Sequence, residues 1–315
     1  TGRECRQDEI RLWNVETGQL VSQPLTGQGT FIKMLAFSPD GKILASAGGE
    51  TIILWDADTR RMLGKITSGH QFESANLFAA GVQTMAFSPD GKMLVSGGCG
   101  KLERRAGQPN YSCGVGELRF WDVKAGQMIG APLAAHTDQV ISLAFSRDGK
   151  TLASAAGSYD DTIQLWDVAT RQKTGRDLAG YDTDMTKMIF SPDGKTLITA
   201  ATMQAETKTY NIFLWDLDKR QIIGQPLTAH TYSLDDMALS PDGRVLASAG
   251  SNFLGGHIDA GSGMHALKLW DMKLETWIEK ACRVANRNLR RAEWELYFSG
   301  QKYRKTCPNL PEPTE

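Results

Sequence analysis

The chain has 315 residues, and 41% of them are hydrophobic, which is enough for a large buried core. Lysine and arginine number 35 against 36 aspartate and glutamate, which leaves a net charge of −1. This balance gives no electrostatic reason to expect binding to nucleic acid or to an anionic membrane surface. The sequence contains no apolar run near the roughly 20 residues that a membrane-spanning helix requires.

Cysteine usage predicts a reducing environment. The five cysteines are scattered and form no CxxC pair: Cys5, Cys99, Cys113, Cys282 and Cys307. Such spacing is typical of mostly free thiols in a cytoplasmic protein. The sequence alone leaves open whether Cys282 and Cys307 form a disulfide. Because the chain starts at Thr1 rather than Met, we also expect it to be a piece of a longer polypeptide.

A short motif recurs along the chain. Residues 38–42 read Ser-Pro-Asp-Gly-Lys, and Leu-Trp-Asp follows about fifteen residues later. The motif returns at residues 88–92, 146–150 (with Arg147 in place of Pro), 191–195 and 240–244. Six tryptophans mark the units, numbered 1 to 6 below: Trp13, Trp55, Trp121, Trp166, Trp215 and Trp270. A period in the forties predicts one supersecondary structure copied several times.

The fourth unit shows the pattern of one copy. Residues 140–145 alternate apolar and small side chains, which is typical of a half-buried strand. A turn at residues 146–149 leads to a second strand, residues 163–166 form a third, and a fourth ends near residue 178. Four short antiparallel strands, repeated radially, predict an all-β propeller built from four-stranded blades.

On these motifs the chain resembles the WD-repeat family of propellers, over roughly residues 9–273. Blades of that family often contain a buried hydrogen-bonded set of His, Ser or Thr, Asp and Trp. Unit 4 has all four members: His136, Ser154, Asp160 and Trp166. The resemblance implies a structural role for this set. A catalytic triad is not expected, because the sister units carry degraded copies of the set and a nucleophile has no reason to be copied around a ring.

The other units depart from the set. Val115 and Met264 stand at the Asp position of units 3 and 6. Gln28 and Tyr181 replace the His of units 2 and 5. We therefore expect apolar packing between units, rather than this polar set, to hold most of the propeller together.

The two ends of the repeat array are incomplete. Residues 9–25 supply only a third and a fourth strand, and unit 6 stops after the third strand at Trp270. We expect about six blade stations, the first and last incomplete, in an N-terminally truncated propeller domain over residues 1–273. Such a ring would be partly open and would leave strand edges unpaired.

The long insertions all fall on one face of the predicted disc. They occupy residues 97–116, 201–211 and 250–265, together with the link at 67–81, whereas the turns on the opposite face stay short. Long loops on a rigid scaffold commonly carry binding sites, so we expect a protein partner on this face. The candidate contacts are basic or aromatic: Phe72, Phe78, Lys101, Arg104, Arg105, Tyr111, Tyr159, Tyr210 and Phe253.

Residues 274–315 differ from the repeats, and we expect a helical tail that packs on the propeller. Residues 274–288 contain no Gly or Pro and predict a helix, and a second helix is expected around 290–298. Trp277, Cys282, Trp294 and Cys307 belong to a pattern that resembles the C-terminal tail of bacterial, especially cyanobacterial, WD-repeat proteins. That resemblance implies a multidomain signalling protein with an effector domain upstream in the same polypeptide.

These observations favour a non-catalytic scaffold or sensor module that binds a protein and needs no cofactor. No metal is expected, because His257 and His265 lie in a Gly-rich segment whose spacing matches no firm ligand pattern. Two alternatives stay open. One is a propeller hydrolase with its site at the central channel, and the other is a periplasmic propeller of the Tol type. The sequence does not identify the partner.

Overall fold

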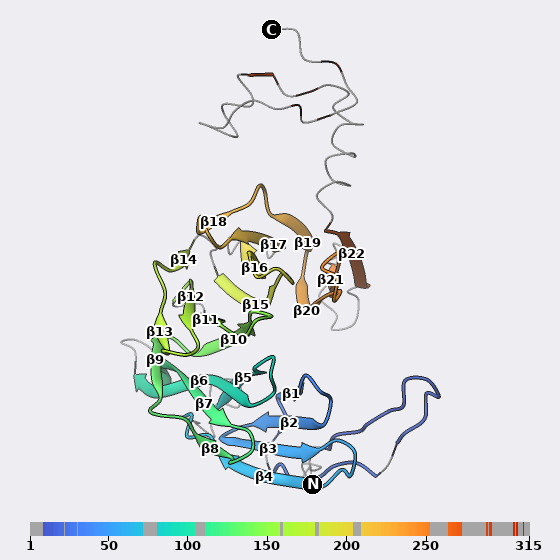
Figure 1. Cartoon of the computed structure of the whole chain (residues 1–315), viewed down its shortest axis with the longest axis vertical. Coiled ribbons are helices and arrows are strands. Elements are labelled where there is room, and N and C mark those ends of the chain that lie inside the picture. The colour runs from blue at the N-terminus through green and yellow to red at the C-terminus, as the bar shows by residue number, and fades with distance from the viewer. Residues whose placement is uncertain are drawn as a thin grey trace, which may run out of the picture.

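The computed structural model describes residues 9–21, 23–29, 31–71, 81–104, 111–157, 160–179, 183–203, 209–252 and 264–272, together with residues 288, 290, 291, 305, 307 and 311. Within these residues the chain forms five antiparallel sheets that follow one another in sequence (Figure 1). The first strands of consecutive sheets are neighbours: β1 with β5, β5 with β10, β10 with β15, and β15 with β20. The all-β propeller architecture is therefore confirmed.

Each of the first two sheets holds one predicted unit. Unit 2 consists of β1 (Met34–Phe37), β2 (Ile43–Gly48), β3 (Thr51–Asp56) and β4 (Met62–Thr67). Unit 3 consists of β5 (Val82–Phe87), β6 (Met93–Arg104), β7 (Tyr111–Asp122) and a fourth strand in two pieces, β8 (Gln127–Met128) and β9 (Leu133–His136).

The remaining sheets repeat this order. Unit 4 consists of β10 (Val140–Phe145), β11 (Thr151–Ala156), β12 (Thr162–Asp167), β13 (Gln172–Lys173) and β14 (Leu178–Ala179). Unit 5 consists of β15 (Thr183–Phe190), β16 (Thr196–Met203), β17 (Thr209–Asp216), β18 (Gln221–Ile222) and β19 (Leu227–His230). Unit 6 has three strands, β20 (Ser233–Leu239), β21 (Val245–Asn252) and β22 (Met264–Asp271).

The recurring motif forms the turn between the first and second strands. Ser38 Oγ donates to Asp40 Oδ1 at 2.6 Å and accepts the Ile43 N–H at 2.9 Å. Gly41 takes a φ of +72°, a backbone conformation that glycine adopts without steric cost. The other four turns contain the same serine-to-aspartate hydrogen bond, so their shape follows from the local sequence.

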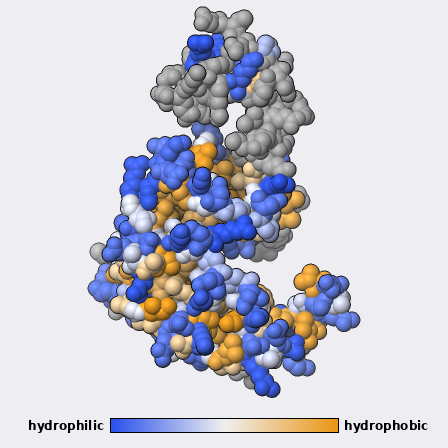
Figure 2. All heavy atoms as spheres, in the orientation of Figure 1, coloured by the Kyte–Doolittle hydropathy of each residue, from blue (hydrophilic) through white to orange (hydrophobic). Residues whose placement is uncertain are grey.

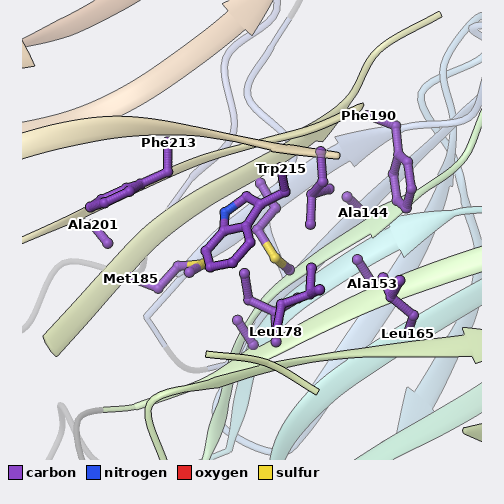
Figure 3. Packing of buried hydrophobic residues seen from close by; sticks show 13 residues of the cluster. Ala144, Ala153, Leu165, Leu178, Met185, Phe190, Ala201, Phe213 and Trp215 are labelled. Carbon is purple, nitrogen blue, oxygen red and sulfur yellow. The ribbon is translucent and has the colours of Figure 1, made fainter. Parts of the chain in front are cut away.

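Apolar packing between consecutive sheets forms the core. In unit 4, Ile163 and Leu165 on β12 are 0% and 4% exposed, and they belong to one cluster with Phe190 and Trp215 of unit 5 (Figure 3). Equivalent clusters join units 2 and 3, units 3 and 4, and units 5 and 6. Burying one such side chain contributes roughly 1.5–3 kcal/mol. The expectation that packing between units provides most of the stability agrees with this arrangement.

The expected six stations are not all present as blades. Five sheets form in the described part of the chain, whereas residues 9–25 make only two isolated bridges, Ile10 to Leu25 and Trp13 to Leu20. Ile10 and Leu25 are buried against Trp55 of unit 2, but Trp13 is 57% exposed. Residues 9–25 correspond to the third and fourth strands of a blade. Without the first and second strands of that blade to pair with, these residues form no sheet of their own.

The insertions differ from the expected loops. β6 and β7 continue well beyond the blade and pair up to Arg104 and Tyr111, so much of residues 97–116 is a β-hairpin. β16 with β17, and β21 with β22, are lengthened in the same direction. Hydrogen-bonded extension satisfies backbone groups that an irregular loop would leave to water.

The expectation of mostly free thiols is wrong. Cys99 on β6 and Cys113 on β7 are both buried and form a disulfide whose Cα atoms lie 5.6 Å apart. Register shifts next to Cys99 bring the two side chains together across the hairpin. A scattered cysteine pattern concealed this pair because the hairpin that joins them was taken for a loop.

Only six residues of the expected tail are described, and no helix is among the elements of the described chain. Of the two predicted helices, at 274–288 and around 290–298, only Asn288, Arg290 and Arg291 are among the described residues, and Arg291 has a helical backbone. The rest of both predictions falls outside the described residues. Asn288 is buried and accepts the Cys307 N–H at 2.6 Å while its amide donates to the Pro311 carbonyl at 2.7 Å. Cys307 is disulfide-bonded to a residue outside the described set. Among the described residues, no helix is long and apolar enough to cross a membrane.

Candidate binding faces

The four residues of the unit 4 set form one hydrogen-bonded chain. Trp166 Nε1 donates to Ser154 Oγ at 2.8 Å, and Ser154 Oγ lies 2.8 Å from His136 Nε2. His136 Nδ1 lies 3.0 Å from Asp160 Oδ1. His136 ends β9, the outer strand of unit 3, whereas Ser154 lies on β11 of unit 4. This row of hydrogen bonds therefore connects the sheet of unit 3 to the sheet of unit 4.

Asp160 is held as a carboxylate. Burial by itself raises its pKa, but hydrogen bonds from His136, Thr162 and the Thr137 N–H outweigh burial and place the pKa well below its usual range. Ser154 is fully buried beneath this network. A nucleophile must reach its substrate, so the inaccessible serine fits a structural role and not hydrolysis.

One bond of the set recurs in every sheet. The indole N–H of the third-strand tryptophan donates to a second-strand hydroxyl at 2.8–3.0 Å, in the pairs Trp55–Ser46, Trp121–Ser96, Trp166–Ser154, Trp215–Thr199 and Trp270–Ser248. In unit 2, Gln28 stands in for histidine. Its Oε1 accepts from Ser46 at 2.7 Å, and its Nε2 donates to the Thr51 carbonyl at 2.9 Å. The polar set is thus more widespread than its sequence pattern indicates.

Units 3 and 6 leave one histidine nitrogen without a partner. His70 Nε2 lies 3.0 Å from Ser96 Oγ and His230 Nε2 lies 3.1 Å from Ser248 Oγ, but neither buried Nδ1 has a hydrogen-bond partner. These are the units with Val115 and Met264 at the Asp position. Burial, and next the nearby Arg119, lower the pKa of His70 to about 3. Burial, and next Lys268, also lower the pKa of His230.

The loop face is described mainly at the β6–β7 hairpin. Lys101 and Arg104 are exposed on β6, and Lys101 Nζ forms an ion pair with Glu103 at 2.8 Å. A hydrogen bond with Glu103 and the charge of its carboxylate raise the pKa of Lys101. Tyr210 is half-buried and packs against the cluster between units 5 and 6, so only part of its ring is open to a partner.

The side chains of the other candidate contacts lie outside the described part of the structure. Tyr111 begins β7, and only its backbone is described. Five candidates lie outside the described residues: Phe72, Phe78, Arg105, Tyr159 and Phe253. The structure therefore brings Lys101 and Arg104 together on one hairpin, which the disulfide closes at its base.

A cavity of about 450 Å³ on the opposite, short-turn face was not predicted. It lies at the ends of the first strands of units 4, 5 and 6, where their turns meet. The one sequence signal for it is Arg147, which replaces the proline of the sister turns. No group of three or more His, Cys, Asp or Glu suited to a metal ion occurs within the part of the chain that is described.

Comparison with known proteins agrees with this geometry. The model of the family "WD domain, G-beta repeat" matches residues 18–56, 66–102, 128–167 and 221–254. The chain is a WD-repeat β-propeller. Units 2, 3, 4 and 6 each contribute to a match, whereas the first three strands of unit 5 lie between the last two matches. No curated protein matches the chain.

Two solved structures show the likeness of fold. Hydrazine synthase of Kuenenia stuttgartiensis is 19% identical with a TM-score of 0.60, over 79% of this chain and 67% of that one. The structure of U3-55K is 22% identical with a TM-score of 0.57, over 79% of this chain and 63% of that one. The WD-repeat chain thus spans about two thirds of these relatives. At such identities the comparison supports the propeller fold alone.

Proposed function

We propose that this WD-repeat propeller is a non-catalytic scaffold or sensor module that binds a protein through the face carrying the β6–β7 hairpin. WD-repeat propellers are commonly protein-interaction scaffolds. The observation that carries the proposal is the asymmetry of the two faces. Units 3, 5 and 6 lengthen their second and third strands toward one face, while the turns of the other keep a constant form. Lys101 and Arg104 are exposed on the longest hairpin, where Lys101 forms an ion pair with Glu103.

Site-specific photo-crosslinking tests the assignment of this face. A photoreactive residue is placed at Lys101 or Arg104, and matched probes are placed at Lys42 and Lys195, which lie at exposed short turns. We expect a partner from the native organism to crosslink from the hairpin positions at least five times more than from the turn positions. Crosslinks to that partner only from Lys42 or Lys195 would place its binding on the opposite face and overturn the proposal.

We also propose that this propeller belongs to a larger signalling protein with an upstream effector domain. The support is the resemblance of residues 274–315 to the tail of bacterial multidomain WD-repeat proteins. The sequence also led us to a cytoplasmic location, but the Cys99–Cys113 disulfide removes the thiol argument, because disulfides persist mainly in oxidising compartments. Counting alkylatable thiols in protein taken from its native source decides this point. A cytoplasmic protein is expected to present both cysteines as free thiols.

We further propose that residues 9–25 belong to a sixth blade. Ile10 and Leu12 pack against the buried cluster of Trp55, in the way that Ile163 and Leu165 of unit 4 pack against Trp215 of unit 5. Their third-strand register relative to Trp13 is the same as in the complete units. Pairing of β-strands upstream of these residues would supply the partners that this station lacks.

A further inference from the structure

Three of the short turns have a proline that lies close to the glycine of the next turn. A Cβ placed on Gly91 would lie 3.6 Å from Pro39, one on Gly149 would lie 3.4 Å from Pro89, and one on Gly243 would lie 2.8 Å from Pro192. Gly194 follows the turn that has Arg147 instead of proline, and a Cβ there would meet nothing within 4 Å. The contact that closes the other turn pairs is therefore missing between units 4 and 5.

The cavity of about 450 Å³ opens at this gap. Its lining is apolar apart from the arginine and the turn serines, and includes Leu143, Phe145, Arg147, Phe190, Pro192 and Leu239. Ala144 and Phe190 line the cavity and also belong to the buried cluster between units 4 and 5, where they lie near each other (Figure 3). This volume falls in the range of ligand-binding pockets and has room for one large apolar side chain with its backbone.

Arg147 supplies a charge at the rim of the cavity. It is exposed, and it makes no hydrogen bond or ion pair with any residue that the structure describes. Asp148, the next residue in the same turn, accepts hydrogen bonds from Ser146 Oγ at 2.7 Å and the Lys150 N–H at 3.0 Å. Asp193 likewise accepts from Ser191 Oγ at 2.6 Å. An unpaired guanidinium beside an apolar cavity is suited to bind a carboxylate in bidentate fashion.

We propose that this cavity binds an extended peptide segment of another protein, in which Asp or Glu is adjacent to Leu or Phe. The carboxylate pairs with Arg147, and the apolar side chain enters the space between Phe145 and Phe190. The turns around the cavity are short and rigid, so the segment binds to a preformed surface. This second site lies on the face opposite the hairpin, and its failure would leave the proposal for the loop face untouched.

Arg147→Pro is the decisive variant, because it restores the residue of the sister turns. It removes the charge and fills the gap, and it is expected to leave the melting temperature unchanged or higher. The probe is a display library of blocked hexapeptides, screened against the full chain. We expect enrichment of peptides with Asp or Glu next to Leu or Phe. The selected peptide is expected to bind Arg147→Pro at least tenfold more weakly.

Two controls make the result specific. Arg147→Gln removes only the charge and is expected to weaken binding about tenfold, whereas Arg244→Gln on the turn of unit 6 is expected to leave it unchanged. Replacing the peptide's acid by its amide is expected to match the loss seen with Arg147→Gln. Equal binding by Arg147→Pro, or a library without acidic enrichment, overturns the proposal. Tight binding of a peptide of residues 306–315 would instead assign the cavity to the chain's own C-terminal segment and also overturn it.

Discussion

At the scale of single residues, the polar set of each unit can be varied as long as its central bond is kept. The indole-to-hydroxyl bond is present in all five sheets, but the group that meets the hydroxyl from the preceding strand is His in three units and Gln in unit 2. A buried hydroxyl needs an acceptor or donor and not a particular residue type. The exchange of His for Gln therefore keeps the structure and changes its response to pH.

His70 is predicted to make the protein sensitive to mild acid. Its pKa of about 3 in the folded state lies below the value of 6.5 expected when unfolded, so protonation favours the unfolded chain. This contribution to stability is complete above pH 6.5 and falls as the pH drops toward 3. At pH 5 the loss relative to pH 7 is about 2 kcal/mol.

His70→Gln, which copies the arrangement of Gln28, is expected to flatten the pH dependence of stability between pH 7 and pH 5. Urea unfolding followed by tryptophan fluorescence at several pH values measures this slope. Asp40 and the other turn aspartates have lowered pKa values, and their effect is confined to pH values below about 4. An unchanged slope in the variant would show that His70 does not carry the effect.

At the scale of elements, the β6–β7 hairpin is the feature that sets unit 3 apart. Its strands are 12 residues each, against six in the second and third strands of units 2 and 4. A projecting hairpin has few neighbours beyond its own partner strand, so its rigidity depends on cross-strand contacts. Cys99 and Cys113 provide a covalent one where the hairpin leaves the blade.

Replacing both cysteines by alanine is predicted to lower stability. The disulfide closes a loop with a sequence separation of 14, for which chain entropy gives about 3 kcal/mol. We expect the Cys99→Ala/Cys113→Ala variant to lose up to this amount in denaturant unfolding, and its hairpin amides to exchange faster with solvent. A variant as stable as the oxidised protein, with equal amide protection in the hairpin, would contradict this role.

The hairpin also shows where sequence reasoning reached its limit. The motif turns, the strands beside them and the packing of the core followed from local chemistry, because Ser, Pro, Asp and Gly each specify a backbone shape. The extension of β6 and β7 did not follow. Residues 97–116 are rich in Gly and charge and show no period of two, yet residues 97–104 pair with residues 111–118 across bulges. The cavity beside Arg147 depends on a contact between turns of different units, which no local pattern contains.

At the scale of the whole molecule, the arrangement is directional. The third strand of each unit presents apolar side chains to the next unit, and the tryptophan face of that unit covers them. In unit 6 the corresponding residues, Leu267 and Leu269 on β22, are each 68% exposed. Figure 2 shows hydrophobic residues beside β22, and hydrophobic and hydrophilic residues are mixed over the rest of the coloured surface. The array therefore ends in a bare face of the kind that is buried between the other units.

This directionality predicts opposite results for the same substitution at equivalent positions. Leu267→Lys with Leu269→Lys changes exposed residues and is expected to cost less than about 0.5 kcal/mol of stability. Ile163→Lys with Leu165→Lys places two charges in the core between units 4 and 5 and is expected to unfold the protein. A buried charge without a partner loses its hydration by water and gains no interaction in exchange. Thermal unfolding of both variants measures the difference.

The exposed leucines are also expected to promote association, because contiguous apolar surface is removed from water when it meets a similar surface. Sedimentation over a tenfold range of concentration should show self-association in the wild-type chain and a clear decrease in Leu267→Lys/Leu269→Lys. Lys substitution at Leu63, an exposed leucine on β4, provides a control of the same chemistry away from this face. If the Leu63 control lowers association as much as the double variant, the effect is general surface charge, and the end face of unit 6 has no special part in it.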